Sequence, residues 1–156
     1  MNTPQPELAI GSDHAAVDLK AKLTAFLKEQ GIRFEDVGPH DDRSVDYPDF
    51  GQQVARMVSD GDVPRGILMC GTGIGMSMVA NRFPGVRAAL CNDLFSAIMG
   101  RRHNDANILV MGARVIGDVL AEEIVRAWLE TPFEGGRHQK RIDLIEQVCS
   151  TGSRLS

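Results

Sequence analysis

A cysteine stands directly before a run of alternating glycines in the middle of this sequence. Residues 67–75 read Ile-Leu-Met-Cys-Gly-Thr-Gly-Ile-Gly, with the thiol at Cys70. A short apolar run closed by glycines is typical of a buried strand that ends in a tight loop. Glycine lets such a loop come close to a ligand and turn its N–H groups toward an anion. The pattern indicates that Cys70 acts as a nucleophile or base on an anionic small molecule; a cysteine that is merely a small buried side chain is the alternative.

Three well-known glycine loops do not fit these residues. A phosphatase loop of the Cys-x5-Arg type needs arginine at position 76, where the chain has Met76. A P-loop ends in Gly-Lys-Ser or Gly-Lys-Thr, which does not occur here. The dinucleotide pattern G-x-G-x-x-G is broken at the same methionine. Asp93 nevertheless follows at a distance suited to a ribose-binding acid, so a nicotinamide nucleotide stays open as an alternative.

Histidines occur at two other places where a helix or strand gives way to a loop. His103 and Asn104 stand at the end of a predicted helix, where an imidazole can exchange protons near neutral pH. Asp13 and His14 follow the first predicted strand, where Asp13 can equally be a helix cap. The spacing of these side chains is not that of a metal site, so we expect no metal.

Arginines form a third group. Arg137 and Arg141 lie four residues apart, on one face of a predicted helix, and Arg114 follows a predicted strand. Positive charge at the start of a helix interacts unfavourably with the helix dipole. Arginine, in turn, can bind phosphate with two parallel hydrogen bonds. These residues indicate an anionic partner, with a solvated basic helix start as the alternative.

The overall composition excludes several classes of protein. The chain has 156 residues, 43% of them hydrophobic, and a net charge of −4, which fits one globular domain without a basic field for nucleic acid or membrane. The three cysteines are too scattered for a disulfide framework, and we expect Cys91 and Cys149 in the core. A signal peptide or transmembrane segment is not expected either, so we predict a cytoplasmic protein.

Short apolar runs alternate with segments of helical periodicity along most of the chain. Strands are predicted at residues 8–10, 32–37, 66–69, 86–90 and 108–111. Helices are predicted up to about residue 30 and at 49–59, 76–83, 94–102, 117–130 and 140–149. This order predicts a single doubly wound α/β domain over 1–156, with a five-stranded parallel sheet and helices on both faces. Ligands bind at the carboxyl ends of such strands, which places the segments starting at Gly11, Cys70, Asn92 and Gly112 on one edge.

The ends of the chain and its last helix are expected to behave differently from this core. Residues 1–7 and 150–156 are predicted to be flexible. The helix 140–149 follows a linker with proline and glycine, and it carries Ile142, Ile145 and Cys149 at helical spacing. We expect this helix to pack on a partner subunit, with packing on its own domain as the alternative.

With these residues identified, nearly the whole chain resembles the family of ribose-5-phosphate isomerase type B, which also includes the galactose-6-phosphate isomerase subunits. Short motifs carry the resemblance in order between about residues 8 and 149. They are Gly11-Ser12-Asp13-His14, Asp46-Tyr47-Pro48, Cys70-Gly71-Thr72-Gly73-Ile74-Gly75, Arg102-His103-Asn104-Asp105-Ala106-Asn107, Gly112-Ala113-Arg114 and Glu134-Gly135-Gly136-Arg137-His138. Each motif is short, but the ordered set is highly specific.

The resemblance implies an aldose–ketose isomerase that interconverts D-ribose 5-phosphate and D-ribulose 5-phosphate through an enediolate, in the pentose phosphate pathway. It implies that Cys70 moves a proton between C1 and C2, and that His103, with Thr72, opens the furanose ring. The remaining implied site residues bind the substrate. They are Asp13 for the sugar hydroxyls; His14, Arg114, Arg137 and Arg141 for the phosphate; Asn104 and the amides of Gly71, Gly73, Ile74 and Gly75 for the enediolate; and Tyr47 as a pocket wall.

The resemblance also implies a Rossmann-like fold and a homodimer, often paired into a tetramer, with active sites shared between two subunits and no metal or cofactor. This chain carries both Cys70 and His103, which favours a homomer over divided galactose-6-phosphate isomerase subunits. Isomerases of allose 6-phosphate, galactose 6-phosphate or a tetrose phosphate remain alternatives. A non-catalytic phosphosugar sensor and a nucleotide-binding module remain alternatives as well.

Overall fold

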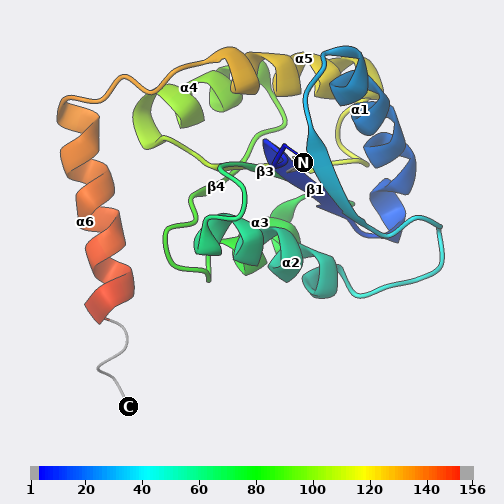
Figure 1. The fold of residues 1–156 in the computed structure, drawn as a ribbon, viewed down its shortest axis with the longest axis horizontal. Coiled ribbons are helices and arrows are strands. Elements are labelled where there is room, and N and C mark those ends of the chain that lie inside the picture. The colour runs from blue at the N-terminus through cyan, green and yellow to red at the C-terminus, as the bar shows by residue number, and fades with distance from the viewer. Residues whose placement is uncertain (1–3, 152–156) are drawn as a thin grey trace.

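The centre of the fold is a five-stranded parallel sheet with the strand order β2-β1-β3-β5-β4 (Figure 1). The computed structural model describes residues 4–151, with side chains up to residue 148. The strands are β1 (Leu8–Ser12), β2 (Phe34–Gly38), β3 (Gly66–Cys70), β4 (Ala88–Leu90) and β5 (Ile108–Gly112). The predicted α/β architecture with five parallel strands is therefore confirmed.

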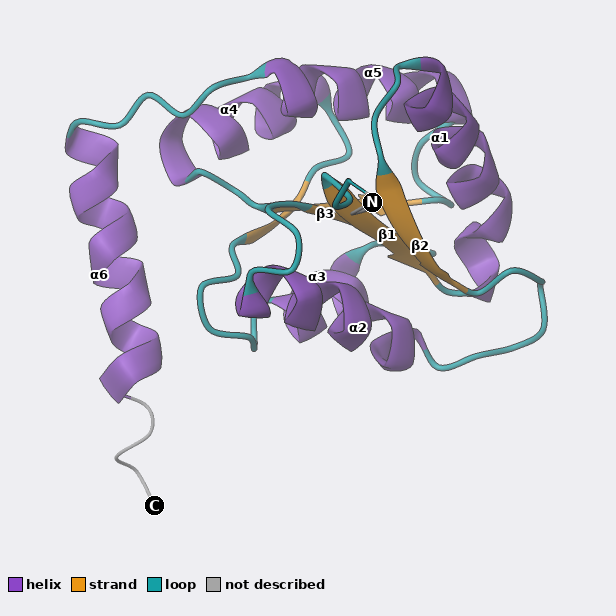
Figure 2. Ribbon diagram, viewed as in Figure 1, coloured by secondary structure: helices purple, strands orange, loops and turns teal. Residues whose placement is uncertain are grey.

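Helices cover both faces of this sheet, as the alternation of strands and helices predicts (Figure 2). The helices are a short 3-10 turn η1 (His14–Ala16), α1 (Val17–Glu29), α2 (Tyr47–Asp60), α3 (Ile74–Ala80), α4 (Leu94–Asn104), α5 (Asp118–Glu130) and α6 (Arg137–Thr151). Helices α1, α4 and α5 lie on one face, and α2 and α3 lie on the other. No helix within residues 4–151 is long and apolar enough to cross a membrane.

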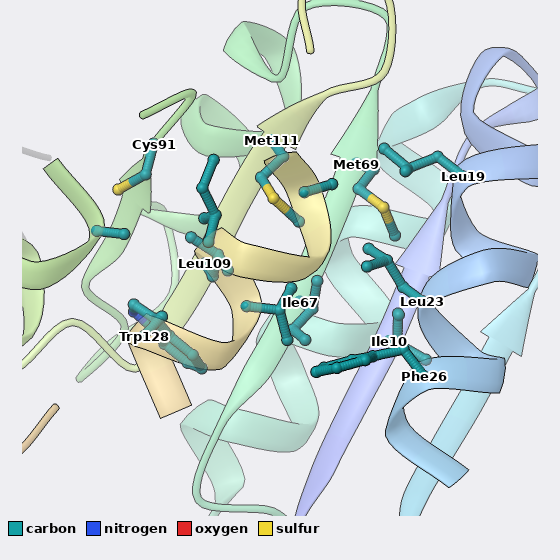
Figure 3. Packing of buried hydrophobic residues seen from close by; sticks show 14 of the residues in the cluster. Ile10, Leu19, Leu23, Phe26, Ile67, Met69, Cys91, Leu109, Met111 and Trp128 are labelled. Carbon is teal, nitrogen blue, oxygen red and sulfur yellow. The ribbon is translucent and has the colours of Figure 1, made fainter. Parts of the chain in front are cut away.

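The period-two geometry of the strands divides the core into two layers. In β3, Ile67 and Met69 point into the layer with α1, α4 and α5, and Leu68 and Cys70 point toward α2 and α3. Trp128 of α5 is fully buried in the first layer, next to Leu109 (Figure 3). Because a strand buried on both faces cannot carry polar side chains, its sequence is a continuous apolar run. Cys70 ends this run at the carboxyl edge of the sheet, where it is still buried in the layer with α2 and α3.

Several element boundaries differ from the prediction for local reasons. Helix α2 begins at Tyr47, before the expected start, because proline fits the first turn of a helix, where its missing N–H costs nothing. Helix α3 begins directly after Gly73, whose φ of 82° ends the loop. Helix α6 begins at Arg137, directly after Gly136, instead of at residue 140. The strands β2 and β4 each start two residues later than expected, at Phe34 and Ala88.

The helical spacing of the sequence predicts an apolar stripe of Leu120, Ile124, Ala127 and Trp128 in α5, and this prediction was partly wrong. Ile124 and Trp128 are buried as expected, but Leu120 is 37% exposed and Ala121 and Val125 take its place in the core. Helix α5 packs against α4, α1 and β5, and which of its side chains these neighbours bury cannot be predicted from periodicity alone.

The last helix lies beside the sheet instead of covering it. Ile142 of α6 is buried and Glu146 pairs with Arg87 on the body of the same chain, with Glu146 Oε1 2.8 Å from Arg87 Nη1. Leu144, Ile145 and Val148 stay exposed. Helix α6 thus contacts its own domain and still presents apolar side chains outward. The Cys149 side chain and residues 1–3 and 152–156 lie outside the described residues, so the expectations for them stay predictions.

The glycine loop after β3 passes very close to the end of β5. A Cβ atom on Gly112 would lie 2.6 Å from the carbonyl oxygen of Thr72. Gly112→Ala must therefore push the Thr72 backbone aside, and we expect it to lower the free energy of unfolding by about 1–3 kcal/mol. Urea denaturation checks the value.

Gly100→Ala is the matched control, because this buried glycine lies inside α4 and a Cβ there would make only ordinary contacts, the nearest being 3.5 Å from Ala89. Alanine favours the helix by up to about 1 kcal/mol, so this variant should be neutral or more stable. Equal stability of the two variants would contradict the close approach of Gly112 to Thr72.

Candidate active site

Four segments meet at the carboxyl edge of the sheet, as predicted, and backbone hydrogen bonds tie them together. The Asp13 N–H donates to the Met69 carbonyl at 3.2 Å, and the Ala113 N–H donates to the Cys70 carbonyl at 2.9 Å. The Gly112 N–H donates to the side-chain oxygen of Asn92 at 2.9 Å. The loops after β1, β3, β4 and β5 therefore form one rigid rim.

The Cys70 thiol lies inside this rim and is 5% exposed. The backbone N–H of Gly73 donates to its sulfur, with an N···S distance of 3.1 Å. This contact directs an amide dipole at the atom that would take up and release a proton. The Thr72 hydroxyl oxygen accepts from the Ile74 N–H at 3.3 Å, which leaves the hydroxyl proton available to a ligand.

Tyr47 and Arg114 stand on either side of the glycine loop. A Cβ on Gly75 would lie 2.6 Å from the Tyr47 ring, so the ring packs directly on the loop, and Tyr47 keeps 39% of its surface exposed. The aliphatic part of the Arg114 side chain passes Gly71, and its backbone N–H donates to the Gly71 carbonyl at 2.9 Å. Tyr47 can therefore form a wall of the site, and Arg114 places a cation at its rim.

Asp13 and His14 complete this half of the site from the end of β1. One carboxylate oxygen of Asp13 accepts from the Ala15 N–H at 3.0 Å, which confirms the capping role that the sequence left open. The His14 Nδ1 accepts from the Val45 N–H at 3.1 Å. A neutral imidazole that accepts at Nδ1 carries its proton at Nε2, so His14 presents a donor for an anion.

A second group of predicted site residues gathers at the end of α4 and the start of α6. The His103 and His138 rings are stacked, with centroids 4.3 Å apart and planes 12° apart. The Glu134 N–H donates to the Arg102 carbonyl at 3.1 Å, which holds the linker against α4. His103, Asn104, Arg137 and Arg141 are therefore neighbours in space although they lie far apart in the sequence.

The two groups lie at opposite edges of the sheet. Helix α4 starts at the carboxyl edge, where Asp93 caps it, and its eleven residues run back for roughly 15 Å. The segment after it stands beside the start of β3, because the Gly66 N–H donates to the Asn107 carbonyl at 2.8 Å. Cys70 ends that same strand, roughly 13 Å further on. Within one chain, Cys70 and His103 therefore do not meet.

Asp93 has a structural role. Its carboxylate accepts from the Ser96 N–H at 2.7 Å and from the Ser96 hydroxyl at 2.8 Å. These two hydrogen bonds, the backbone one first, hold the pKa of the Asp93 carboxyl below its usual value. The Asp93 carboxylate is therefore the N-cap of α4, whereas the sequence left a ribose-binding acid open only as an alternative.

Arg87 was missed by the sequence analysis. Its guanidinium donates to the carbonyls of Asn104 and Asp105, both at 3.0 Å, and pairs with Glu146 of α6. It thereby joins the end of α4 to α6. Arg87 stands alone before a short strand, and no sequence motif around it indicates this role. Asn92, whose side-chain oxygen accepts from the Gly112 N–H, was predicted to lie at the carboxyl edge, but the sequence analysis gave it no role.

Among the described residues, one group could offer three metal ligands. Ligand atoms of His103, Glu134 and His138 lie within 4.8 Å of one another. The two imidazole planes are nearly parallel, and the nitrogen lone pairs lie in those planes, so they do not converge on one point. The arrangement fits a stacked pair with a nearby carboxylate better than a metal site.

Comparison with known proteins identifies the family. The family model described as Ribose/Galactose Isomerase matches residues 8–145. Ribose-5-phosphate isomerase B of Escherichia coli is 45% identical over 91% of this chain and 95% of its own, and a D-erythrulose-4-phosphate isomerase of Pectobacterium atrosepticum is 45% identical over 88% and 91%. The structure of the Clostridium thermocellum ribose-5-phosphate isomerase B has a TM-score of 0.91 and 49% identity, over 92% of this chain and 97% of that one. The chain therefore belongs to the ribose/galactose isomerase family.

Proposed function

We propose that this chain, as one isomerase domain over residues 1–156, interconverts D-ribose 5-phosphate and D-ribulose 5-phosphate. The observation that carries the proposal is the Cys70 thiol at the end of β3, with a loop amide donating to its sulfur. Membership of the family and the names of the relatives from E. coli and C. thermocellum support the choice of substrate. We propose that the reaction needs no metal or cofactor.

Ring opening is the first step that the cyclic aldose requires. A proton leaves the C1 hydroxyl, a proton reaches the ring oxygen, and the C1–O4 bond breaks to give the open aldehyde. Imidazole suits this exchange because it can give and take protons near neutral pH. We assign it to His103, assisted by the free Thr72 hydroxyl proton.

Isomerisation then moves one proton between neighbouring carbons. The Cys70 thiolate takes the proton from C2, an enediolate forms, and the thiol returns a proton to C1. The C2 hydroxyl gives up its proton and the C1 oxygen gains one in the same conversion, so that the C1 carbonyl of the aldose becomes the C2 carbonyl of the ketose. Negative charge develops on the two oxygens during this step, and the loop amides of Gly71, Gly73, Ile74 and Gly75, with Asn104, are assigned to stabilise it. One well-placed donor is worth on the order of 3 kcal/mol in such a transition state.

A second copy of the chain is proposed to complete each site. Asp13, His14, Tyr47, Cys70 and Arg114 lie at the carboxyl edge, while the second group lies at the opposite edge, so one chain offers two separate halves. A homodimer that joins the halves would place Arg137 and Arg141 opposite Arg114 and His14, around one phosphate. Exposed Leu144, Ile145 and Val148 on α6 give it an apolar face to pack on the partner. Pairing of dimers into a tetramer is compatible with this arrangement.

A tetrose phosphate is a second candidate substrate, because the relative named a D-erythrulose-4-phosphate isomerase is as similar in sequence as the E. coli relative. The purified chain should form ribulose 5-phosphate from ribose 5-phosphate in the presence of a chelator. A parallel assay with erythrose, allose and galactose phosphates ranks the substrates by kcat/KM. Failure to turn over ribose 5-phosphate while another phosphosugar reacts would overturn the assignment.

Cys70→Ala tests the proposed base. We expect kcat to fall by about a hundredfold or more, with little change in substrate affinity, because the change removes a proton carrier and no binding contact. Steady-state kinetics and isothermal titration with substrate measure the two quantities.

Cys91→Ala is the matched control for this experiment. Burial, with the nearby Asp93 carboxylate as a smaller cause, raises the pKa of the Cys91 thiol from 9.0 to about 12, so it holds its proton at neutral pH. This variant should keep near-normal kcat. Full activity of Cys70→Ala would rule out the thiol as the base.

Arg137→Ala tests the phosphate contact. Because this arginine is proposed to bind the phosphate in ground state and transition state alike, KM should rise about tenfold or more with kcat nearly unchanged. Arg33→Ala is the control, since Arg33 pairs with Glu7 next to β2, and β2 is the outer strand on the other side of the sheet from β4 and α6. An unchanged KM in Arg137→Ala would contradict the assignment.

A further inference from the structure

We propose that His138 is a positioning residue that holds the His103 imidazole in place for ring opening. The inference rests on the proposed role of His103 and adds a residue to which the sequence analysis assigned no role. His138 stacks on His103 from the first turn of α6, across from the last turn of α4. It is a side-chain contact between the end of α4 and the start of α6, in addition to the Glu134–Arg102 backbone bond and the contacts of Arg87.

Burial distinguishes the two imidazoles. His138 is 5% exposed, whereas His103 is only partly covered. One face of His103 therefore rests on a buried ring while the rest of it stays open to a ligand. A side chain at the end of a helix would otherwise sample several rotamers, and fixing it in one reduces the entropy that the reaction must lose.

Burial and the neighbouring positive groups favour a neutral His138 ring, whereas the Glu134 carboxylate acts in the opposite direction. Glu134 from the linker lies 3.7 Å from Nε2, and Arg137 and Arg141 of its own helix and His103 of α4 are the other titratable groups that act on it. Burial, followed by the positive charge of His103, lowers the pKa of His138. A neutral buried ring can support its neighbour by contact, but it is poorly suited to deliver a proton itself.

The chemistry of the two sugars separates ring opening from proton transfer at carbon. Ribose 5-phosphate is a closed ring and must open before it reacts. Ribulose 5-phosphate carries its phosphate on the oxygen that would close a five-membered ring, so it is already open. Exchange of its C1 proton with D2O therefore needs Cys70 but not the ring-opening imidazole.

The experiment compares these two reactions in His138→Ala. We expect kcat with ribose 5-phosphate to fall by about tenfold to a hundredfold, because displacing an acid–base group from its productive position slows the reaction by about this factor. Exchange at C1 of ribulose 5-phosphate, followed by NMR in D2O, should stay within about twofold of wild type, which also shows that the variant is folded. His138→Phe keeps an aromatic ring for stacking and should restore most of the lost kcat.

His40→Ala is the control, because His40 is an exposed histidine on the loop after β2, outside both halves of the site. It should change neither reaction. The proposal is wrong if His138→Ala slows both reactions equally, if it raises only KM, or if His138→Phe is as impaired as His138→Ala. If the wild-type chain itself neither isomerises nor exchanges, the proposed function fails instead.

Discussion

The direction of the chain in a parallel sheet is the constraint on which this structure depends. Every strand runs the same way, so every connecting helix must run back, and a helix ends at the edge opposite the one where its preceding strand ended. Cys70 ends a strand and His103 ends a helix. The same rule that brings Asp13, Cys70 and Arg114 together therefore keeps His103 away from them. A chain built this way holds the proposed site residues in two separate groups.

Close packing makes the first of these groups rigid. The glycine loop passes so near the end of β5 and the Tyr47 ring that a Cβ atom on Gly112 or Gly75 would overlap its neighbours. Hydrogen bonds from the Gly73 amide to the Cys70 sulfur and from Gly112 to Asn92 fix the loop further. A thiol held in this way has one orientation, which is what a base needs when it serves two adjacent carbons.

Much of this architecture could be predicted from the sequence, because apolar runs indicate buried strands and glycines indicate the tight loops that end them. The strand that ends at Cys70 is buried on both faces, and its continuous apolar run shows it. The loops after the strands gather at the carboxyl edge because all the strands of a parallel sheet run in one direction. The stacking of His103 on His138 and the clamp made by Arg87 could not be predicted, since both are long-range contacts without a local pattern. At Asp93 the spacing of a ribose-binding acid coincides with the start of a helix, so the sequence left that role open as an alternative, and the structure shows the helix cap.

The claim that two chains share each site is tested most directly by mixing two inactive variants. Cys70→Ala and His103→Asn each disable both sites of their own homodimer. When equal amounts are unfolded and refolded together, half of the dimers should be mixed, and each mixed dimer has one intact site, so about a quarter of wild-type activity should return. Activity that stays at the level of the separate variants, in a mixture shown to contain mixed dimers, would mean that Cys70 and His103 act within one chain and would contradict the account.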